Sequence, residues 1–185
     1  LGEVEFQLGN AQAAADVLAL QLKNFPRGQR ADEARFILAR AYEQLDRTDE
    51  AIALYRQLAA NPQGARAADA QFHLAAQQFE AEQYAQAAEA FAALARSFPR
   101  HKLAALAHLN AGYSHYHRGD EEAAVAFFTR VANDPEWGHT ARYWIGLSDK
   151  AQGEFTRAAD TLLALFREDQ QQPLAESILY HAAGS

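Results

Sequence analysis

Proline recurs at nearly constant intervals, and this spacing constrains the fold more than any other feature of the sequence. The five prolines lie at positions 26, 62, 99, 135 and 173, and the chain contains no others. Successive prolines are separated by 36, 37, 36 and 38 residues. A fixed period of this length is typical of an internal repeat, so the sequence predicts an array of similar units.

The segment that precedes each proline is also repeated. The clearest copy is QYAQAAEAFAALARSFP at residues 83–99, and related segments occupy residues 10–26, 47–62, 119–135 and 153–173. We therefore expect residues 1–185 to form one continuous array of about five units. The sequence contains no Met and opens within a unit, so we interpret it as a fragment that is cut in mid-repeat at both ends.

Apolar residues follow the period of an α-helix within each unit. Ala34, Leu38, Ala41 and Leu45, for example, are spaced by three or four residues and form one stripe. Leu1 and Gly2 are expected to be the last packing residues of a half-missing helix. Complete helices are predicted at residues 11–24, 31–45, 49–60, 65–81, 84–97, 103–118, 121–133, 140–152 and 155–168, and the first helix of a sixth pair at 174–183. No segment shows the alternation of a strand, so the predicted fold is all-α.

The joins between these helices alternate between two kinds. Within a pair, a short turn contains Gly9, Gly119 or Gly153, and Asp46 and Glu82 replace the glycine in the other two units. Glycine reaches positive φ easily, and acidic residues that follow the turn favour the start of the next helix. Between pairs, proline lacks a backbone N–H and disfavours helix at the residue before it. The pattern predicts antiparallel helix pairs with short connections.

Composition excludes several classes of protein. The net charge is −7, the isoelectric point is near 5.5, and no run of clustered Lys and Arg is present, which argues against a nucleic-acid partner. No apolar run approaches the roughly 20 residues of a membrane span, and the first residues carry no signal-peptide pattern. The absence of cysteine excludes disulfides, thiolate metal sites and cysteine nucleophiles, and suits a cytosol and an oxidising envelope equally well.

The sequence contains no recognisable catalytic or metal-binding motif. GxSxG, GxGxxG, P-loop and HExxH patterns are all absent. His101, His108 and His115 are spaced by seven residues, which is too far along a helix for one shared ion, and His117 lies on another face. We expect these histidines to be solvated or to face a neighbouring helix. The chain is therefore predicted to be no enzyme and to need no cofactor or metal.

Small and large residues alternate at fixed places in every unit. Within the second helices, an alanine precedes a large residue by four positions in each copy, in the pairs Ala14 and Leu18, Ala51 and Tyr55, Ala87 and Phe91, Ala124 and Phe128, and Ala158 and Leu162. The first helices carry the dipeptides Leu1-Gly2, Leu38-Ala39, Leu74-Ala75, Ala111-Gly112 and Ile145-Gly146. A small residue is required where two helix backbones nearly touch, and a large one where a gap must be filled.

This set of positions resembles the tetratricopeptide repeat, with its Leu-Gly, Ala, aromatic and Pro signature. The Phe-Pro-Arg joins at residues 25–27 and 98–100 are most similar to a subclass in bacterial envelope proteins, such as the Tol-Pal coordinator and the repeat lipoprotein of the outer-membrane barrel assembly machine. The sequence departs from the family pattern because the Trp of the first helix is missing in every copy. The resemblance implies a right-handed superhelical solenoid of antiparallel helix pairs.

The resemblance also implies that the first helices line a concave groove that binds a ligand. The corresponding positions hold Phe36, Arg40, Glu43, Phe72, Phe79, Glu80, Asn110, Tyr113, Tyr116, His117, Tyr143, Trp144, Leu147 and Lys150. A groove rich in aromatic side chains suits the capture of a peptide or protein, although any single aromatic residue could instead pack between repeats. We expect an acidic end with Glu43, Asp69 and Glu80, and a partly exposed aromatic end with Tyr113, Tyr116, Tyr143 and Trp144.

The function expected from this resemblance is a non-catalytic protein-interaction scaffold within a bacterial envelope assembly. Two alternatives remain open: a structural spacer or self-association module, which would form a homo-oligomer, and a scaffold in polysaccharide export, where stacked aromatic side chains would also serve. The expected location is the periplasm or the outer membrane, with a cytoplasmic location left open. No direct insertion into a membrane is expected.

Overall fold

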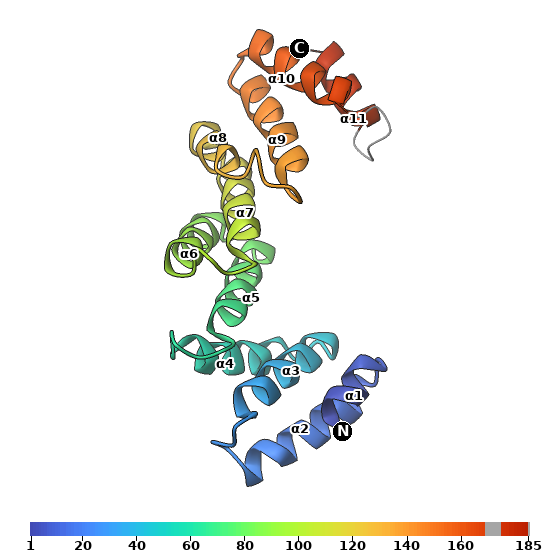
Figure 1. Ribbon diagram of the computed structural model, residues 1–185, viewed down its shortest axis with the longest axis vertical. Coiled ribbons are helices and arrows are strands. Elements are labelled where there is room, and N and C mark those ends of the chain that lie inside the picture. The colour runs from blue at the N-terminus through green and yellow to red at the C-terminus, as the bar shows by residue number, and fades with distance from the viewer. Residues whose placement is uncertain (169–174, 185) are drawn as a thin grey trace. The chain divides into compact units, whose positions relative to one another are not determined.

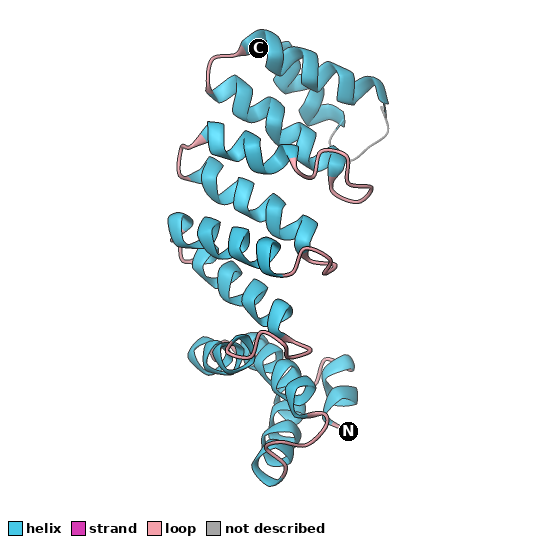
Figure 2. Ribbon diagram, turned by 60° about the vertical axis from the view of Figure 1, so that its left-hand side comes forward, coloured by secondary structure: helices cyan, strands magenta, loops and turns pink. Residues whose placement is uncertain are grey.

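The computed structural model describes residues 1–168 and 175–184, and these residues fold as eleven α-helices without a strand (Figure 1, Figure 2). The helices are α1 (Gly2–Gln7), α2 (Ala11–Asn24), α3 (Ala31–Gln44), α4 (Thr48–Ala59), α5 (Ala67–Glu80), α6 (Tyr84–Ser97), α7 (Ala104–His117), α8 (Glu121–Thr129), α9 (Gly138–Ala151), α10 (Phe155–Glu168) and α11 (Ala175–Ala183). The predicted all-α fold of helix pairs is therefore confirmed. The last predicted join and Pro173 lie outside the described residues.

The chain divides into two compact units, with the boundary inside α5. The first unit is Leu1–Gln77 and the second is Gln78–Ser185. In the first unit α1 packs on α2, α2 on α3, and α3 on α4. In the second unit each helix from α6 to α11 packs on the next one in the chain. Both units thus consist of consecutive helices that bury their apolar stripes against sequence neighbours, as a repeat array requires. That the whole chain forms one continuous array stays a prediction.

Most predicted helix boundaries agree with the structure within two residues, and α8 is the main exception. It ends at Thr129, four residues before the predicted end. Beyond Thr129, the N–H groups of Arg130 and Val131 donate to carbonyls three residues earlier, which tightens the chain out of the α-helical path. The Asp134 carboxylate then accepts from the backbone N–H groups of Glu136 and Trp137 and leads the chain into α9. These local hydrogen bonds compete with continuation of the helix.

The turns within helix pairs share a left-handed residue at the same place. Gly9, Gly119 and Gly153 have φ values of 81°, 77° and 80°, and the two residues that replace glycine, Asp46 and Glu82, have φ values of 57° and 58°. A side chain at positive φ is strained, less so for Asp than for Glu. The repeat therefore imposes its turn conformation even where the sequence does not offer glycine.

The small residues predicted for the helix crossings lie at the closest approach of the two helices of a pair. A Cβ added to Gly112 would lie 2.5 Å from Phe128, one added to Gly146 would lie 2.7 Å from Leu162, and one added to Gly2 would lie 2.6 Å from Leu18. The alanine that precedes each large residue is also buried, with Ala124 fully inaccessible to solvent. The predicted pairing of small and large residues is thus confirmed for these three crossings.

The first prediction from this packing concerns Ala124. Replacing Ala124 by Leu should lower the free energy of unfolding by about 1 to 3 kcal/mol, because a larger side chain cannot enter this filled crossing without displacing its neighbours. Ala126→Leu is the matched control, since Ala126 lies on the same helix but is exposed. Chemical denaturation followed by circular dichroism measures both variants. Equal stability of the two would show that the crossing is not tightly packed.

The second prediction concerns the left-handed turns. Glu82→Gly and Asp46→Gly should each stabilise the fold, by about 0.5 to 1 kcal/mol and with the larger gain at Glu82, because glycine relieves the strain of positive φ. Gly119→Ala should destabilise by a similar amount, although no atom lies within 4 Å of the added Cβ. Thermal and urea unfolding measure these shifts. A loss of stability in Glu82→Gly would contradict this account of the turn.

Candidate functional site

The predicted groove positions of the first unit hold residues that contact side chains outside the predicted set. Phe36 is buried, at 8% exposure, within a cluster that also contains Ala39, Tyr55 and Ala70. Arg40 is exposed, and its guanidinium lies 5.1 Å from the centre of the Phe6 ring. These aromatic and cationic side chains therefore join neighbouring helices.

Glu43 is the centre of a polar cluster that sequence reasoning missed. Its carboxylate accepts a hydrogen bond of 2.9 Å from the Tyr55 hydroxyl and lies 3.2 Å from Nδ1 of His73. The Tyr55 and His73 rings stack with centroids 4.6 Å apart. We call Glu43, Tyr55 and His73 the Glu43 cluster, and it ties α3, α4 and α5 together. Tyr55 was predicted only as a packing residue, because sequence spacing does not show where its hydroxyl points.

The electrostatics of the Glu43 cluster favour an ionised carboxylate. Burial acts to raise the pKa of Glu43, but the hydrogen bond and charge of His73, the Tyr55 hydroxyl and the charge of Arg40 outweigh it, so the pKa lies below its ordinary value. Burial and the neighbouring Glu43 charge raise the pKa of the Tyr55 phenol, which stays neutral. The cluster thus resembles a structural hydrogen-bond network more than an acid-base pair.

The predicted acidic end of the groove is partly paired within the first unit. Asp69 is buried, at 7% exposure, and its carboxylate lies 3.5 Å from Arg66. Arg66 also donates two hydrogen bonds, of 2.6 and 2.7 Å, to Glu33. Since Glu43 and Asp69 already have partners in the fold, they offer less charge to a ligand than the sequence suggested. Phe72, the remaining groove position of this unit, is half-buried and makes an edge contact with His73.

The second unit carries a continuous set of aromatic contacts. Phe79 and Tyr84 meet at 5.3 Å, and both contact His117, which stacks on Tyr84 with centroids 5.2 Å apart. Tyr116 contacts His117 at 6.1 Å and Trp144 at 5.0 Å. Tyr113 meets the same indole at 5.0 Å. We call this set the aromatic stripe, comprising Phe79, Tyr84, Tyr113, Tyr116, His117 and Trp144.

The aromatic stripe is only partly covered by the protein. His117 is exposed, whereas the other five members are half-buried. The inner side of the stripe rests on Phe128, which is fully buried and lies 5.5 Å from Tyr113 and 6.2 Å from Trp144. Burial raises the pKa of Tyr113 to about 12, so this part of the stripe is uncharged at neutral pH. The stripe presents rigid apolar faces with polar edges to solvent.

Tyr143 does not belong to this exposed surface, and its predicted partial exposure is wrong. The side chain is 8% exposed and packs in a cluster with Leu162, Leu165, Ile178 and Ala182. Ile178 and Ala182 belong to α11, which covers Tyr143 as the first helix of the following pair. The sequence places Tyr143 next to Trp144, but adjacent helical residues point in directions about 100° apart, so only one of them lies in the open.

The remaining predicted groove residues are not members of the stripe. Asn110 is half-buried, and its backbone carbonyl accepts a hydrogen bond of 2.8 Å from the Ser114 hydroxyl. Leu147 packs partly buried beside Tyr143. The Lys150 ammonium donates to the His181 carbonyl at 3.1 Å, and Glu80 is the exposed last residue of α5. Tyr84, the first residue of α6, belongs to the stripe but is not among the predicted groove residues.

The histidines of α7 face different partners. Nδ1 of His115 lies 3.1 Å from the Asp120 carboxylate, and its ring stacks on Phe127, while His117 stacks on Tyr84. His108 is half-buried, and burial and the charge of Arg130 lower its pKa. Within residues 1–168 and 175–184, no three His, Cys, Asp or Glu side chains gather closely enough to hold a metal ion. Across those same residues, no helix has the length and apolar character needed to cross a membrane.

The Glu43 cluster leads to a prediction for stability against pH. Because the pKa of Glu43 is lowered by folding, its contribution should be present above the ordinary value of 4.5 and be lost as the pH falls through the lower folded value. Glu43→Gln should therefore cost about 1 kcal/mol at neutral pH, allowing for partial solvent access, and progressively less towards roughly pH 3.

Urea unfolding at a series of pH values measures this difference, with Asp16→Asn, an exposed carboxylate on α2, as the control. The control should follow the wild type at every pH. A difference between Glu43→Gln and wild type that stays constant down to roughly pH 3 would show that the carboxylate charge is not what stabilises the cluster.

Comparisons with known proteins agree on the fold. No curated protein matches the sequence. Among solved structures, the chain is similar to MamA, with a TM-score of 0.76 and 17% identity over 92% of this chain and 95% of that one. It is also similar to TTC0263, a thermophilic protein of Thermus thermophilus, with a TM-score of 0.53 and 20% identity over 100% and 94% of the two chains. Identities this low support the fold alone.

A third similar structure is the TPR2AB domain of yeast Sti1 in complex with pHSP90, with a TM-score of 0.55 and 14% identity over 98% of this chain and 81% of that one. At the level of sequence, the profile of the family described as tetratricopeptide repeat matches residues 1–66 and 72–136. These ranges cover more than half of the chain and include the repeated proline, alanine and turn positions of the first four units. The chain belongs to the tetratricopeptide repeat family.

Proposed function

We propose that this chain is a non-catalytic scaffold that holds a peptide or protein segment on its aromatic stripe. The observation that carries the proposal is the contiguous, half-exposed array of rings supplied by α5, α6, α7 and α9. Aromatic side chains bury a large area on binding and lose little conformational entropy, because few bonds become fixed. The tyrosine hydroxyls can in addition orient a backbone.

The contrast with other aromatic residues of the chain supports a binding role. Phe36 and Tyr143 also belong to the predicted groove set. Both are buried between helices, so packing accounts for an aromatic residue at these positions. Tyr116 and Trp144 keep part of their surface open to solvent, and hydrophobic area left open in a folded protein favours a partner. The stripe therefore offers more contact area than the packing of the repeats requires.

The family relationship supports the same kind of partner. Tetratricopeptide repeat proteins are generally non-catalytic, and the Sti1 structure is a complex with another protein component. The net charge of −7 disfavours nucleic acid as the ligand. We therefore propose a peptide or protein partner and no cofactor, and a homo-oligomer is compatible with the same surface.

The place of action is also a proposal. The Phe-Pro-Arg joins resemble those of repeat proteins in the bacterial envelope. They favour a role in an envelope assembly, with the chain in the periplasm or associated with the outer membrane. Cell fractionation of the parent protein with a C-terminal tag tests this location. Recovery in the cytosolic fraction alone would contradict it.

The binding prediction concerns Tyr116 and Trp144. Peptides selected from a phage-displayed library on the wild-type chain should bind Tyr116→Ala and Trp144→Ala more weakly, by about 2 kcal/mol or more for each anchor. Isothermal titration measures the affinity. In a Trp137→Phe background the fluorescence of Trp144 should shift when the peptide binds, since that indole is then the only one in the chain.

The matched control is Phe155→Ala, because Phe155 is a half-exposed aromatic residue of the same unit outside the stripe, at 53% exposure. Circular dichroism melts establish that all variants remain folded, which matters because Trp144 also contacts the buried Phe128. Peptides that bind the stripe variants as tightly as wild type would overturn the proposed site. In that case, a spacer or self-association role would explain the chain better.

A further inference from the structure

The region around α7 lacks acidic residues, which is unusual for this acidic chain. The sequence contains 24 Asp and Glu among 185 residues, so a stretch of 30 residues would hold about four by chance. Residues 90–119 hold none. The same stretch contains Arg96, Arg100, Lys102 and Arg118, and four of the seven histidines. Positive charge is thus concentrated in one part of a chain whose net charge is −7.

The structure gathers part of this charge at the connection between α6 and α7. Arg96 lies in the last turn of α6, Arg100 and Lys102 lie in the join to α7, and all three are exposed. Arg130, which follows α8, stands 4.9 Å from the centre of the Phe127 ring, and that ring lies 6.1 Å from His108 of α7. We call Arg96, Arg100, Lys102 and Arg130 the basic join.

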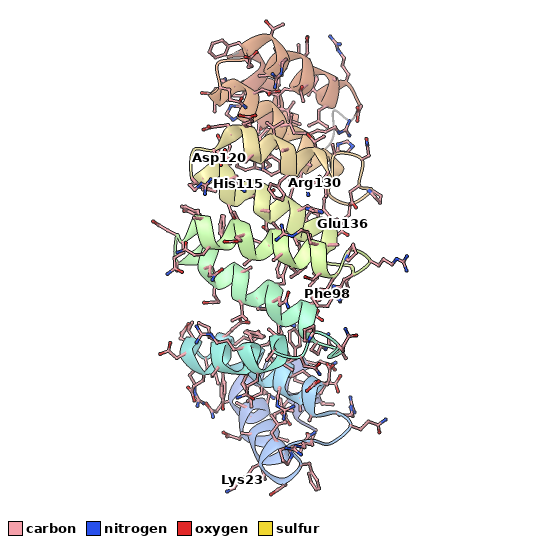
Figure 3. The ribbon with its side chains drawn as sticks, turned by 90° about the vertical axis from the view of Figure 1, so that its left-hand side faces the viewer. Lys23, Phe98, His115, Asp120, Arg130 and Glu136 are labelled. Atoms are coloured by element: carbon pink, nitrogen blue, oxygen red, sulfur yellow. The ribbon has the colours of Figure 1, made fainter. Side chains whose placement is uncertain are left out.

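Figure 3 labels Arg130 of the basic join and four other residues of the second unit. Phe98 and Arg130 lie at one edge, and His115 and Asp120 lie at the opposite edge. Glu136 lies at the same edge as Arg130, but no ion pair among the described residues connects Glu136 to the basic join. Oδ1 of Asp134, four residues after Arg130, accepts hydrogen bonds from the backbone N–H groups of Glu136 and Trp137.

Most other arginines of the chain form ion pairs, unlike the four cations of the basic join. Arg30, Arg35, Arg47, Arg66, Arg118, Arg142 and Arg157 each form an ion pair with a carboxylate. Among the described residues, no carboxylate pairs with Arg96, Arg100, Lys102 or Arg130. An acidic chain that leaves neighbouring cations unpaired concentrates a positive potential there.

We propose that the basic join is a second docking surface, which binds a short acidic segment of a protein partner. Charge complementarity orients such a segment and speeds its association, and arginine can hold carboxylates through two hydrogen bonds at once. A second copy of this chain, an anionic lipid surface and a nucleic acid are the competing occupants that the experiment below distinguishes.

A short acidic segment fits this surface better than an extended polyanion. Residues 78–185 contain nine Lys and Arg against 14 Asp and Glu, a net charge of −5. A duplex or a membrane surface would extend well beyond the basic join and meet the surrounding negative charge within the screening length of about 8 Å. A segment of a few carboxylates can contact the basic join alone.

The basic join is separate from the aromatic stripe. Tyr113, Tyr116 and His117 lie in the last turns of α7, whereas Arg100 and Lys102 precede its first turn. A helix of 14 residues is about 20 Å long, so the two surfaces lie near opposite ends of α7. Binding at the basic join therefore does not depend on the function proposed for the stripe.

Fluorescence anisotropy with a fluorescein-labelled peptide of ten glutamates tests the proposal. The variant Arg100→Glu with Lys102→Glu removes two cations of the basic join. The matched control is Lys23→Glu with Arg27→Glu, at the other Phe-Pro-Arg join, so both variants have a net charge of −11. At roughly 50 mM salt the first variant should bind the peptide at least about tenfold more weakly than wild type, and the control less than about twofold.

Further measurements decide between the occupants. Tyr116→Ala should bind the glutamate peptide as wild type does, and circular dichroism melts should show every variant folded. Equal losses in the two charge variants would overturn the proposal, because the effect would then follow net charge alone. Tighter binding of phosphatidylglycerol vesicles or of a single-stranded DNA oligomer, lost in the Arg100 and Lys102 variant, would overturn it in favour of a polyanion. Self-association through this edge in sedimentation experiments, without binding of the peptide, would also overturn it.

Discussion

The contact between a small residue on one helix and a large residue on its partner underlies the whole structure. Gly112 allows α7 to approach Phe128 so closely that even a Cβ could not be added without displacement. Gly146 and Leu162 form the same contact in the next pair. Each pair buries its apolar stripe only when its two helices come this close, so the repeat depends on keeping one position small.

This contact also determines where the aromatic stripe lies. Phe128 fills the gap opposite Gly112, and its ring also contacts the rings of Tyr113 and Trp144. Tyr113 is the neighbour of Gly112 in the chain, and its ring therefore turns from the crossing towards the next helix. Phe128 therefore contributes both to the packing of the second unit and to the position of its exposed aromatic surface. A change at the crossing would alter both.

The two units use equivalent positions of the repeat for different purposes. In the first unit Phe36 and Glu43 are joined to Tyr55 and His73, so the polar groups satisfy one another within the fold. Buried carboxylates need such partners, because an unpaired charge is costly in a medium of low dielectric constant. In the second unit Phe79 and Tyr116 hold the position of Glu43 in two repeats and need no charged partner, so part of their surface can remain open. A repeat with a fixed backbone thus supplies polar contacts between helices in one unit and a half-exposed aromatic surface in the other.

The repeat, the helices and their joins can be predicted from the amino-acid sequence. Proline spacing, the helical period and the alternation of small and large residues are local features, and local features read along the chain predict which segments are helical and which residues meet at a crossing. The left-handed conformation of Asp46 and Glu82, which replace the turn glycine, is seen only in the structure. The early end of α8 did not follow from the sequence, because propensity does not show that Arg130 and Val131 donate to carbonyls only three residues earlier.

Which predicted groove residues are open and which are paired depends on contacts between helices that the sequence does not show. Tyr143 and Trp144 are adjacent in the chain, but α11 covers the first and leaves the second half-exposed. Glu43 and Asp69 read as free acidic charges until the structure placed Tyr55, His73 and Arg66 beside them. Exposure and pairing are set by residues far away in the sequence, and a repeat pattern specifies positions on a helix without specifying what the next helix brings to them.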